Sequence, residues 1–322
     1  MQSPKVSKKV STQSLVKKAK TTGSSKNSKV ALLLLLPGIF YLGLFFITPF
    51  ASLITTSLQA PVLGGGIGVY QPALEFGNYV FVVTEYFDQI IRSFIYATLA
   101  TLLALAISYP IAYFIAVKAR NKPVLQALLL TLVIAPFFIS FLLRTFAWKQ
   151  VFGQNSWLST ILRDTGLMAD DQFLLGSSFA VVFGLTYNFI PFMTLPLYTN
   201  LERLDTALLE AGSDLYATPT STFWKVTFPL SIPGITSGTL LTFIPVAGDF
   251  VTASGNFLGS PNTSMLGNVI EANFITIQDF PSASALSVLL MAAIVVLVSV
   301  GYHDQLQGFH VQSLLDQKVE VP

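Results

Sequence analysis

Long uncharged stretches alternate with short polar ones along this chain of 322 residues. A helix needs about 20 residues to cross a bilayer, because each residue adds roughly 1.5 Å to its length. We expect the uncharged stretches to form one all-α membrane domain, residues 30–302, with tails at residues 1–29 and 303–322. Six stretches are long enough to predict membrane-spanning helices: Ala31–Leu58, Ser93–Val117, Val124–Leu143, Phe173–Leu201, Val226–Gly248 and Phe280–Tyr302.

A further uncharged stretch, Phe250–Ile270, has a different pattern. It contains Gly255, Gly259, Pro261 and Asn262, and residues of these types do not suit a helix that faces lipid. The pattern predicts an outer loop between the last two spans, lying either fully outside the membrane or partly re-entrant.

Composition and charge agree with a membrane location. Only 11% of the residues are charged, whereas a soluble domain has about 25%, so we predict a multi-pass protein of the cell membrane. With a cytoplasmic N-terminus, fourteen of the eighteen Lys and Arg residues lie on the cytoplasmic side, as expected for membrane proteins. This orientation places both termini, and the loop after the fourth span, in the cytoplasm.

Several functions are excluded by what the sequence lacks. The first 30 residues contain eight Lys and no acid, which is typical of a disordered tail attracted to lipid headgroups. No aromatic residues are interleaved with these lysines, so we expect no nucleic-acid partner. The chain has no Cys, no GxxxxGK[ST] or HExxH motif, and only two histidines, His303 and His310, both beyond the last span. We therefore predict no metal site, no cofactor and no catalytic residues, and hence not an enzyme.

One polar segment, residues 201–225, lies between long apolar stretches, and we call it the polar loop. It carries six charged side chains: Glu202, Arg203, Asp205, Glu210, Asp214 and Lys225. Asp205 can cap a first short helix, and Thr218-Pro219 is a typical start of a second. Glu210 and Asp214 are four residues apart and share a face of the first helix. The polar loop either lies on the lipid headgroups or contacts a partner in the cytoplasm.

The polar loop resembles the EAA loop of ABC importer permeases. The resemblance rests on Glu210-Ala211, Asp214-Leu215, Phe223–Thr227 and Pro229–Gly234. It implies a permease subunit that works with a second permease, a dimer of cytoplasmic ATP-binding subunits and an external solute-binding protein. It also implies that the loop docks on the ATPase, with Glu210 as the docking acid and the coupling contacts at Glu210, Ala211, Gly212, Asp214, Leu215 and Tyr216.

Two positions depart from the pattern of this family. Gly212 stands where the family favours Ala, and Tyr216 stands where it favours Gly. A Gly between two helices commonly supplies a positive φ, which a bulky residue adopts only at a cost of about 1–2 kcal/mol. Either the corner is made differently in this chain, or the groove of the partner ATPase has a different shape.

Other segments resemble the permeases of spermidine/putrescine importers. They are Ser140–Trp148, Pro191–Tyr198, Ile244-Pro245 with Gly248–Val251, and Leu266–Asn268, and the similarity runs from about Pro37 to the last span. The resemblance implies a translocation path for a small solute, with a polyamine as the expected one. The alternatives are a permease for another small solute and a membrane scaffold protein that transports nothing.

Candidate residues for the substrate path are Asp249, Arg144 and Trp148. An ionised side chain within a membrane is costly and commonly marks a pathway. Asp249 is interpreted either as an acid at the outer interface or as a cavity-lining acid that attracts a cation. Arg144 and Lys149 could pair with Asp249, or with acids of an external binding protein.

Overall fold

The computed structural model describes residues 24–169 and 171–319 and divides into two compact units, residues 1–53 and 54–322. The first unit holds α2 (Ser24–Leu42), the π-helical turn η1 (Gly43–Ile47) and the beginning of α3 (Thr48–Ser57). Leu33–Ser57 is long and apolar enough to cross a membrane. Most of the predicted N-terminal tail lies outside the described residues, but α2 begins at Ser24, within that tail.

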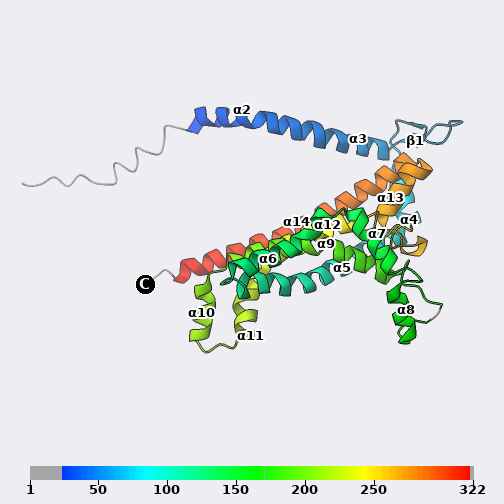
Figure 1. The fold of residues 1–322 in the computed structure, drawn as a ribbon. Helices are drawn as coiled ribbons and strands as arrows, with labels where there is room; N and C mark the ends of the chain where they lie inside the picture. The colour runs from blue at the N-terminus through cyan, green and yellow to red at the C-terminus, as the bar shows by residue number, and fades with distance from the viewer. Residues whose placement is uncertain (1–23, 170, 320–322) are drawn as a thin grey trace, which may run out of the picture. The chain divides into compact units, whose positions relative to one another are not determined.

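The second unit is built on four long helices, which Figure 1 shows in cyan to red. α5 (Phe87–Tyr113) continues into the π-helix η2 (Phe114–Lys118), and α9 spans Ser178–Glu202. The short helix α11 (Pro219–Thr222) and the π-helix η4 (Phe223–Thr227) lead into α12 (Phe228–Ala247). α14 runs from Phe280 to Val319, so helical backbone continues past the predicted end of the last span at Tyr302.

Small residues let α5, α9 and α12 pack closely. The core between them includes Ala97 and Ala100 of α5 and Val181 and Leu185 of α9. A Cβ atom on Gly238 of α12 would lie 2.8 Å from Sδ and 3.1 Å from the carbonyl oxygen of Met193 in α9. Close backbone approach at small residues is the usual way in which helices associate in lipid.

The third predicted span is not one straight helix. Residues 124–143 contain α6 (Pro123–Ile134), the 3₁₀ turn η3 (Ala135–Phe138) and the start of α7 (Phe141–Val151). Ile139, with φ −96° and ψ 133°, is extended, and the two halves are bent by 91°. The physical reason is local, since Pro136 in η3 cannot donate the backbone hydrogen bond that would continue α6, and the chain becomes extended at Ile139. Among the described residues five helices can span a membrane, and this broken pair makes a sixth if it counts as one span.

The segment between α12 and α14 is compact rather than open. It contains η5 (Pro261–Thr263), α13 (Leu266–Glu271) and the π-helix η6 (Ala272–Ile277). Leu258 and Met265 are fully buried, and a Cβ on Gly259 would lie 1.9 Å from the carbonyl oxygen of Ala253. The segment therefore packs against the bundle through Leu258 and Met265, and its partly re-entrant placement stays a prediction.

Shorter elements complete the second unit. Strands β1 (Ala60–Pro61) and β2 (Tyr70–Gln71) form a small antiparallel hairpin that the sequence analysis did not predict. Helix α4 (Gly77–Glu85) precedes α5, α8 (Trp157–Asp164) precedes α9, and α10 (Thr206–Asp214) follows α9. Because α9 lies between them in the chain, α8 and α10 stand at opposite ends of the bundle (Figure 1).

Candidate functional site

The polar loop forms two short helices joined by a tight corner, as predicted. The carboxylate of Asp205 caps α10 by accepting a hydrogen bond from the backbone N–H of Ala207, at 3.0 Å. The hydroxyl of Thr218 caps α11 through the N–H of Ser221, and Pro219 occupies the first turn. These caps satisfy backbone donors that a helix start otherwise leaves unpaired.

Tyr216 makes the corner with a left-handed backbone, at φ 55°. The N–H of the next residue, Ala217, donates to the carbonyl of Gly212 at 3.0 Å, which is the hydrogen bond of a Schellman helix end. The alternative in which the corner is made differently in this chain is therefore wrong. The Tyr216 side chain is 97% exposed, so the bulky residue meets no steric obstacle beyond its own backbone.

Gly212, the other departure, brings the two short helices into contact. A Cβ atom at this position would lie 3.0 Å from Oγ1 and 3.1 Å from Cγ2 of Thr222, at the end of α11. The Ala that the family favours would force Thr222 to move. Gly212 is thus explained by the close approach of α10 and α11.

The exposed face of α10 combines acids with apolar side chains. Glu210 and Asp214 are both exposed, and so are Leu208 at 46% and Leu215 at 81%. The side chain of Ala211 is not among those described. Carboxylates beside exposed apolar groups at the end of a membrane bundle form a surface suited to binding another protein.

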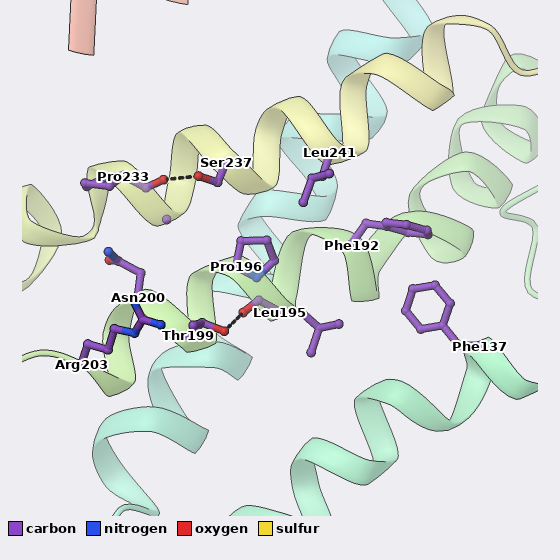
Figure 2. Close-up of a pocket in the computed structure, with 11 residues that line it drawn as sticks. Phe137, Phe192, Leu195, Pro196, Thr199, Asn200, Arg203, Pro233, Ser237 and Leu241 are labelled. Atoms are coloured by element: carbon purple, nitrogen blue, oxygen red, sulfur yellow. Dashed lines mark hydrogen bonds between the residues drawn. The ribbon is translucent and has the colours of Figure 1, made fainter. Parts of the chain in front are cut away.

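A groove of about 520 Å³ lies between α9 and α12, close to the polar loop. Figure 2 shows its two ends. One end is apolar, with Phe137, Phe192 and Leu241, and the other has Asn200 and Arg203. The side-chain oxygen of Asn200 is buried with no hydrogen-bond partner among the described residues. The sequence analysis missed this groove, because it arises from the packing of two helices and has no motif of its own.

The three predicted path residues lie outside this groove. The ring of Trp148 packs against Phe183 and Tyr187, at centroid distances of 4.6 and 5.3 Å. Arg144 is 8% exposed and lies over the ring of Phe141 at 5.9 Å. Its Nε and Nη1 atoms have no hydrogen-bond partner within the described part of the chain.

Asp249 is buried and organises its own loop. Its carboxylate accepts hydrogen bonds from the backbone N–H of Thr252 at 2.7 Å and from the Thr252 hydroxyl at 3.2 Å. Burial raises the pKa of the Asp249 carboxyl above its ordinary value, and the hydrogen bonds from Thr252 oppose that rise. Acceptance of hydrogen bonds from the loop is the arrangement of a side chain that holds local structure.

Arg144 and Lys149 do not pair with Asp249 in this structure. The ammonium of Lys149 instead donates to the carbonyl of Asn256 at 2.7 Å. Arg144 forms no hydrogen bond through Nε or Nη1 to any described residue, Asp249 included. No group of three or more His, Asp or Glu side chains that could hold a metal ion is found within residues 24–169 and 171–319.

Comparison with known proteins decides the family. A family model for the "Binding-protein-dependent transport system inner membrane component" matches residues 108–307. The chain belongs to this family. It is therefore a multi-pass, inner-membrane permease subunit of an ABC importer and not a catalytic subunit, and the resemblance found in the polar loop is confirmed.

Relatives of known name point in the same direction. The chain is 34% identical over 257 residues to the spermidine/putrescine transport system permease protein PotB of Haemophilus influenzae, covering 80% of this chain and 86% of that protein. It is 34% identical over 236 residues to PotB of Escherichia coli, covering 73% and 82%. The inner membrane ABC transporter permease protein YdcU of Escherichia coli is 27% identical over 234 residues, covering 69% and 72%.

Solved structures share the fold. A bacterial ABC transporter involved in the import of the acidic polysaccharide alginate matches with a TM-score of 0.64 at 16% identity, covering 88% of this chain and 96% of that chain. The MetNI methionine ABC transporter, in an inward-facing conformation, matches with a TM-score of 0.53 at 18% identity, covering 70% and 94%. At these identities the likeness describes the helical architecture alone.

Proposed function

We propose that this chain forms part of the translocation path of a polyamine importer, with spermidine or putrescine as the solute. The observation that carries the proposal is the 34% identity to the Haemophilus influenzae spermidine/putrescine permease over most of both chains. The proposed partners are a second permease, a dimer of cytoplasmic ATP-binding subunits and an external solute-binding protein.

In this proposal the polar loop docks on the ATPase. Glu210 and Asp214 would meet basic groups there, and the exposed Leu215 and Tyr216 at the corner would add apolar contact. Closure of the ATPase dimer would then push α10, and the bundle would change between inward and outward access. The side-chain surface of α10 supports this role because its acids are exposed and available to a partner.

The proposed path residues differ in how well their surroundings suit a cation. Trp148 belongs to an aromatic cluster with Phe183 and Tyr187, and aromatic faces attract ammonium groups. Asp249 has the right charge, but its carboxylate already accepts hydrogen bonds from Thr252. Arg144 would repel a polyamine and suits a contact with an acid of a partner chain. The proposal therefore gives most weight to Trp148.

The solute is tested with the complex reconstituted in vesicles with its ATPase, second permease and binding protein. Labelled spermidine should accumulate in an ATP-dependent way, and spermidine should stimulate ATP hydrolysis. Import of an anion or a neutral sugar, with no stimulation by polyamines, would overturn the polyamine proposal and leave the permease family unchanged. Failure of any ATPase to co-purify would favour a scaffold protein.

The docking role of Glu210 is tested by Glu210→Ala. We expect normal amounts of the subunit in the membrane, because Glu210 is exposed and contributes little to folding. Loss of a charge-assisted contact worth about 1.5–3 kcal/mol should weaken ATPase binding and lower transport. The exposed acid Glu85, which belongs to α4 at the other end of the bundle, provides a control as Glu85→Ala. Wild-type uptake and wild-type ATPase recovery from Glu210→Ala would rule out the docking role.

A further inference from the structure

The C-terminal end of α5 and the turn that follows it contact both ends of the polar loop, although along the chain that loop is connected only to α9 and α12. Residues 119–122 form the turn between η2 and α6, and Ala119 in this turn is buried. The turn is well ordered by backbone hydrogen bonds, from Ala119 to Phe114 and from Lys122 to Ala119, both at 2.8 Å. These hydrogen bonds fix the backbone of the turn relative to the end of η2.

Arg120 in this turn forms hydrogen bonds to the start of the polar loop. Its guanidinium donates one hydrogen bond to the carbonyl of Leu204, at 3.0 Å, and another to the carbonyl of Glu202. These carbonyls lie at and just beyond the end of α9, where a helix lacks internal donors and carries partial negative charge. A guanidinium suits such a site, since its planar fork offers several N–H donors in a fixed arrangement.

The carboxylate of Glu202 adds a second attachment beside Arg120. It accepts hydrogen bonds from the hydroxyl of Tyr198 at 2.6 Å and from the amide of Gln126 in α6 at 3.3 Å. The C-terminal end of α9 is thus connected to the α5–α6 turn through its backbone and to α6 through its side chain.

Phe223 attaches the other end of the polar loop to the same helix. Its ring packs edge-on against Tyr109 and Tyr113 of α5, with centroid distances of 5.7 Å to each. The hydroxyl of Tyr109 also lies 2.9 Å from the hydroxyl of Ser231 in α12. One end of the loop is therefore hydrogen-bonded to the turn that follows α5 and η2, and the other end packs against α5 through aromatic rings.

We propose that α5 receives the movement of the polar loop directly and that Arg120 is the positioning residue that transmits it. The inference rests on the proposed docking of this loop on an ATPase. A displacement of α10 would move α5 together with α9 and α12, because Arg120 and Phe223 fix the two ends of the loop to α5 and the turn that follows it. Without Arg120 the ATPase would still bind, since Arg120 lies outside the exposed face of α10, but its movement would reach the bundle less completely.

The test compares Arg120→Ala with Lys118→Ala in the reconstituted complex. Lys118 is an exposed cation next to the same turn, and its side chain has no hydrogen bond to another described residue, so its variant removes the same charge without the contacts. We expect Arg120→Ala to retain the ATPase and its ATP hydrolysis, whereas spermidine delivered per ATP falls about fivefold or more. Arg120→Lys should give an intermediate ratio, because an ammonium is a point charge without the fork. Lys118→Ala should match wild type.

An unchanged ratio of spermidine to ATP in Arg120→Ala would overturn the inference. So would a parallel loss of ATPase binding, which would make Arg120 a docking or folding residue. If the wild-type complex itself retains no ATPase, the proposed function fails first, and the inference fails with it.

A second measurement does not depend on the solute. The chain has no native Cys, so a nitroxide can be placed at Leu208→Cys on the exposed face of α10. Arg120→Ala and Phe223→Leu should each increase the mobility of this label, because each frees one end of the loop from α5. Spectra identical to that of the parent in both variants would contradict the inference even where transport measurements fail.

Discussion

The contact with Thr222 explains why position 212 is a Gly. The Ala that the family favours at position 212 would displace the Thr222 side chain by a few tenths of an ångström. Tyr216 differs, because its unfavourable free energy comes from its own left-handed backbone conformation, while its side chain is exposed to solvent. At the scale of single residues, the two departures from the family pattern thus have separate physical causes.

The Gly212–Thr222 contact can be tested with a double-mutant cycle. Gly212→Ala should separate α10 from α11 and lower transport, because its new Cβ would lie 3.0 Å from Thr222 Oγ1. Overpacking of this kind costs about 1–3 kcal/mol. Adding Thr222→Ala should restore transport, because it removes both atoms that the methyl group meets. A double variant no better than Gly212→Ala alone would contradict this explanation.

Two roles of Asp249, holding its loop or lining the substrate path, predict opposite orders of effect for Asp249→Asn and Asp249→Glu. If its carboxylate holds the loop, Asp249→Asn should be tolerated, because an amide oxygen can still accept from the Thr252 N–H. Asp249→Glu should then destabilise the subunit, since burial leaves no room for a longer side chain. A buried N–H left unpaired by Asp249→Ala should cost about 1–3 kcal/mol. Thermal unfolding in detergent measures these effects.

The alternative role gives the opposite order. If the Asp249 charge faces the substrate path, Asp249→Asn should lower polyamine uptake more than Asp249→Glu does, at equal amounts of protein. Uptake measured beside thermal stability therefore separates a residue that holds structure from one that attracts a cation.

At the scale of elements, the segment between α12 and α14 depends on backbone contacts. A Cβ on Gly267 of α13 would lie 2.6 Å from the carbonyl oxygens of both Gly248 and Asp249, whereas a Cβ on Gly255 would meet nothing within 4 Å. The two glycines belong to the same segment but have different surroundings.

Gly267→Ala should therefore reduce the amount of folded subunit, because backbone oxygens cannot move aside as a flexible side chain can. Gly255→Ala is the matched control and should leave stability within about 0.5 kcal/mol of wild type. Both are measured by membrane abundance and thermal unfolding. Equal stability of the two variants would show that α13 does not pack against the end of α12 in the membrane.

At the scale of the whole molecule, the charge distribution predicts which side each loop faces. Positions 121 and 220 should be cytoplasmic, and positions 65 and 262 external, because most of the Lys and Arg residues then lie inside. Single Cys residues introduced into the native chain, which has none, can be labelled with an impermeant reagent in intact cells. Labelling of a Cys at position 220 would show that the polar loop faces outward and would contradict the predicted orientation.

The sequence by itself determined the membrane class, the places of the long helices and the caps of the polar loop. Each of these depends on residues close together in the chain: an uncharged run of sufficient length, or Asp205 and Thr218 just before the helices that they cap. The sequence left open how the corner at Tyr216 is made, and only the structure shows its positive φ of 55°.

Only the tertiary structure decided the rest, because contacts between distant segments leave no local pattern. The 91° break after η3 makes Arg144 and Trp148 part of a helix that turns away from α6. The buried carboxylate of Asp249, the fit of Gly212 against Thr222 and the groove at Asn200 each depend on packing. The attachment of Arg120 to the end of α9 joins residues more than eighty positions apart. Such a contact exists only once α5 and α9 lie side by side.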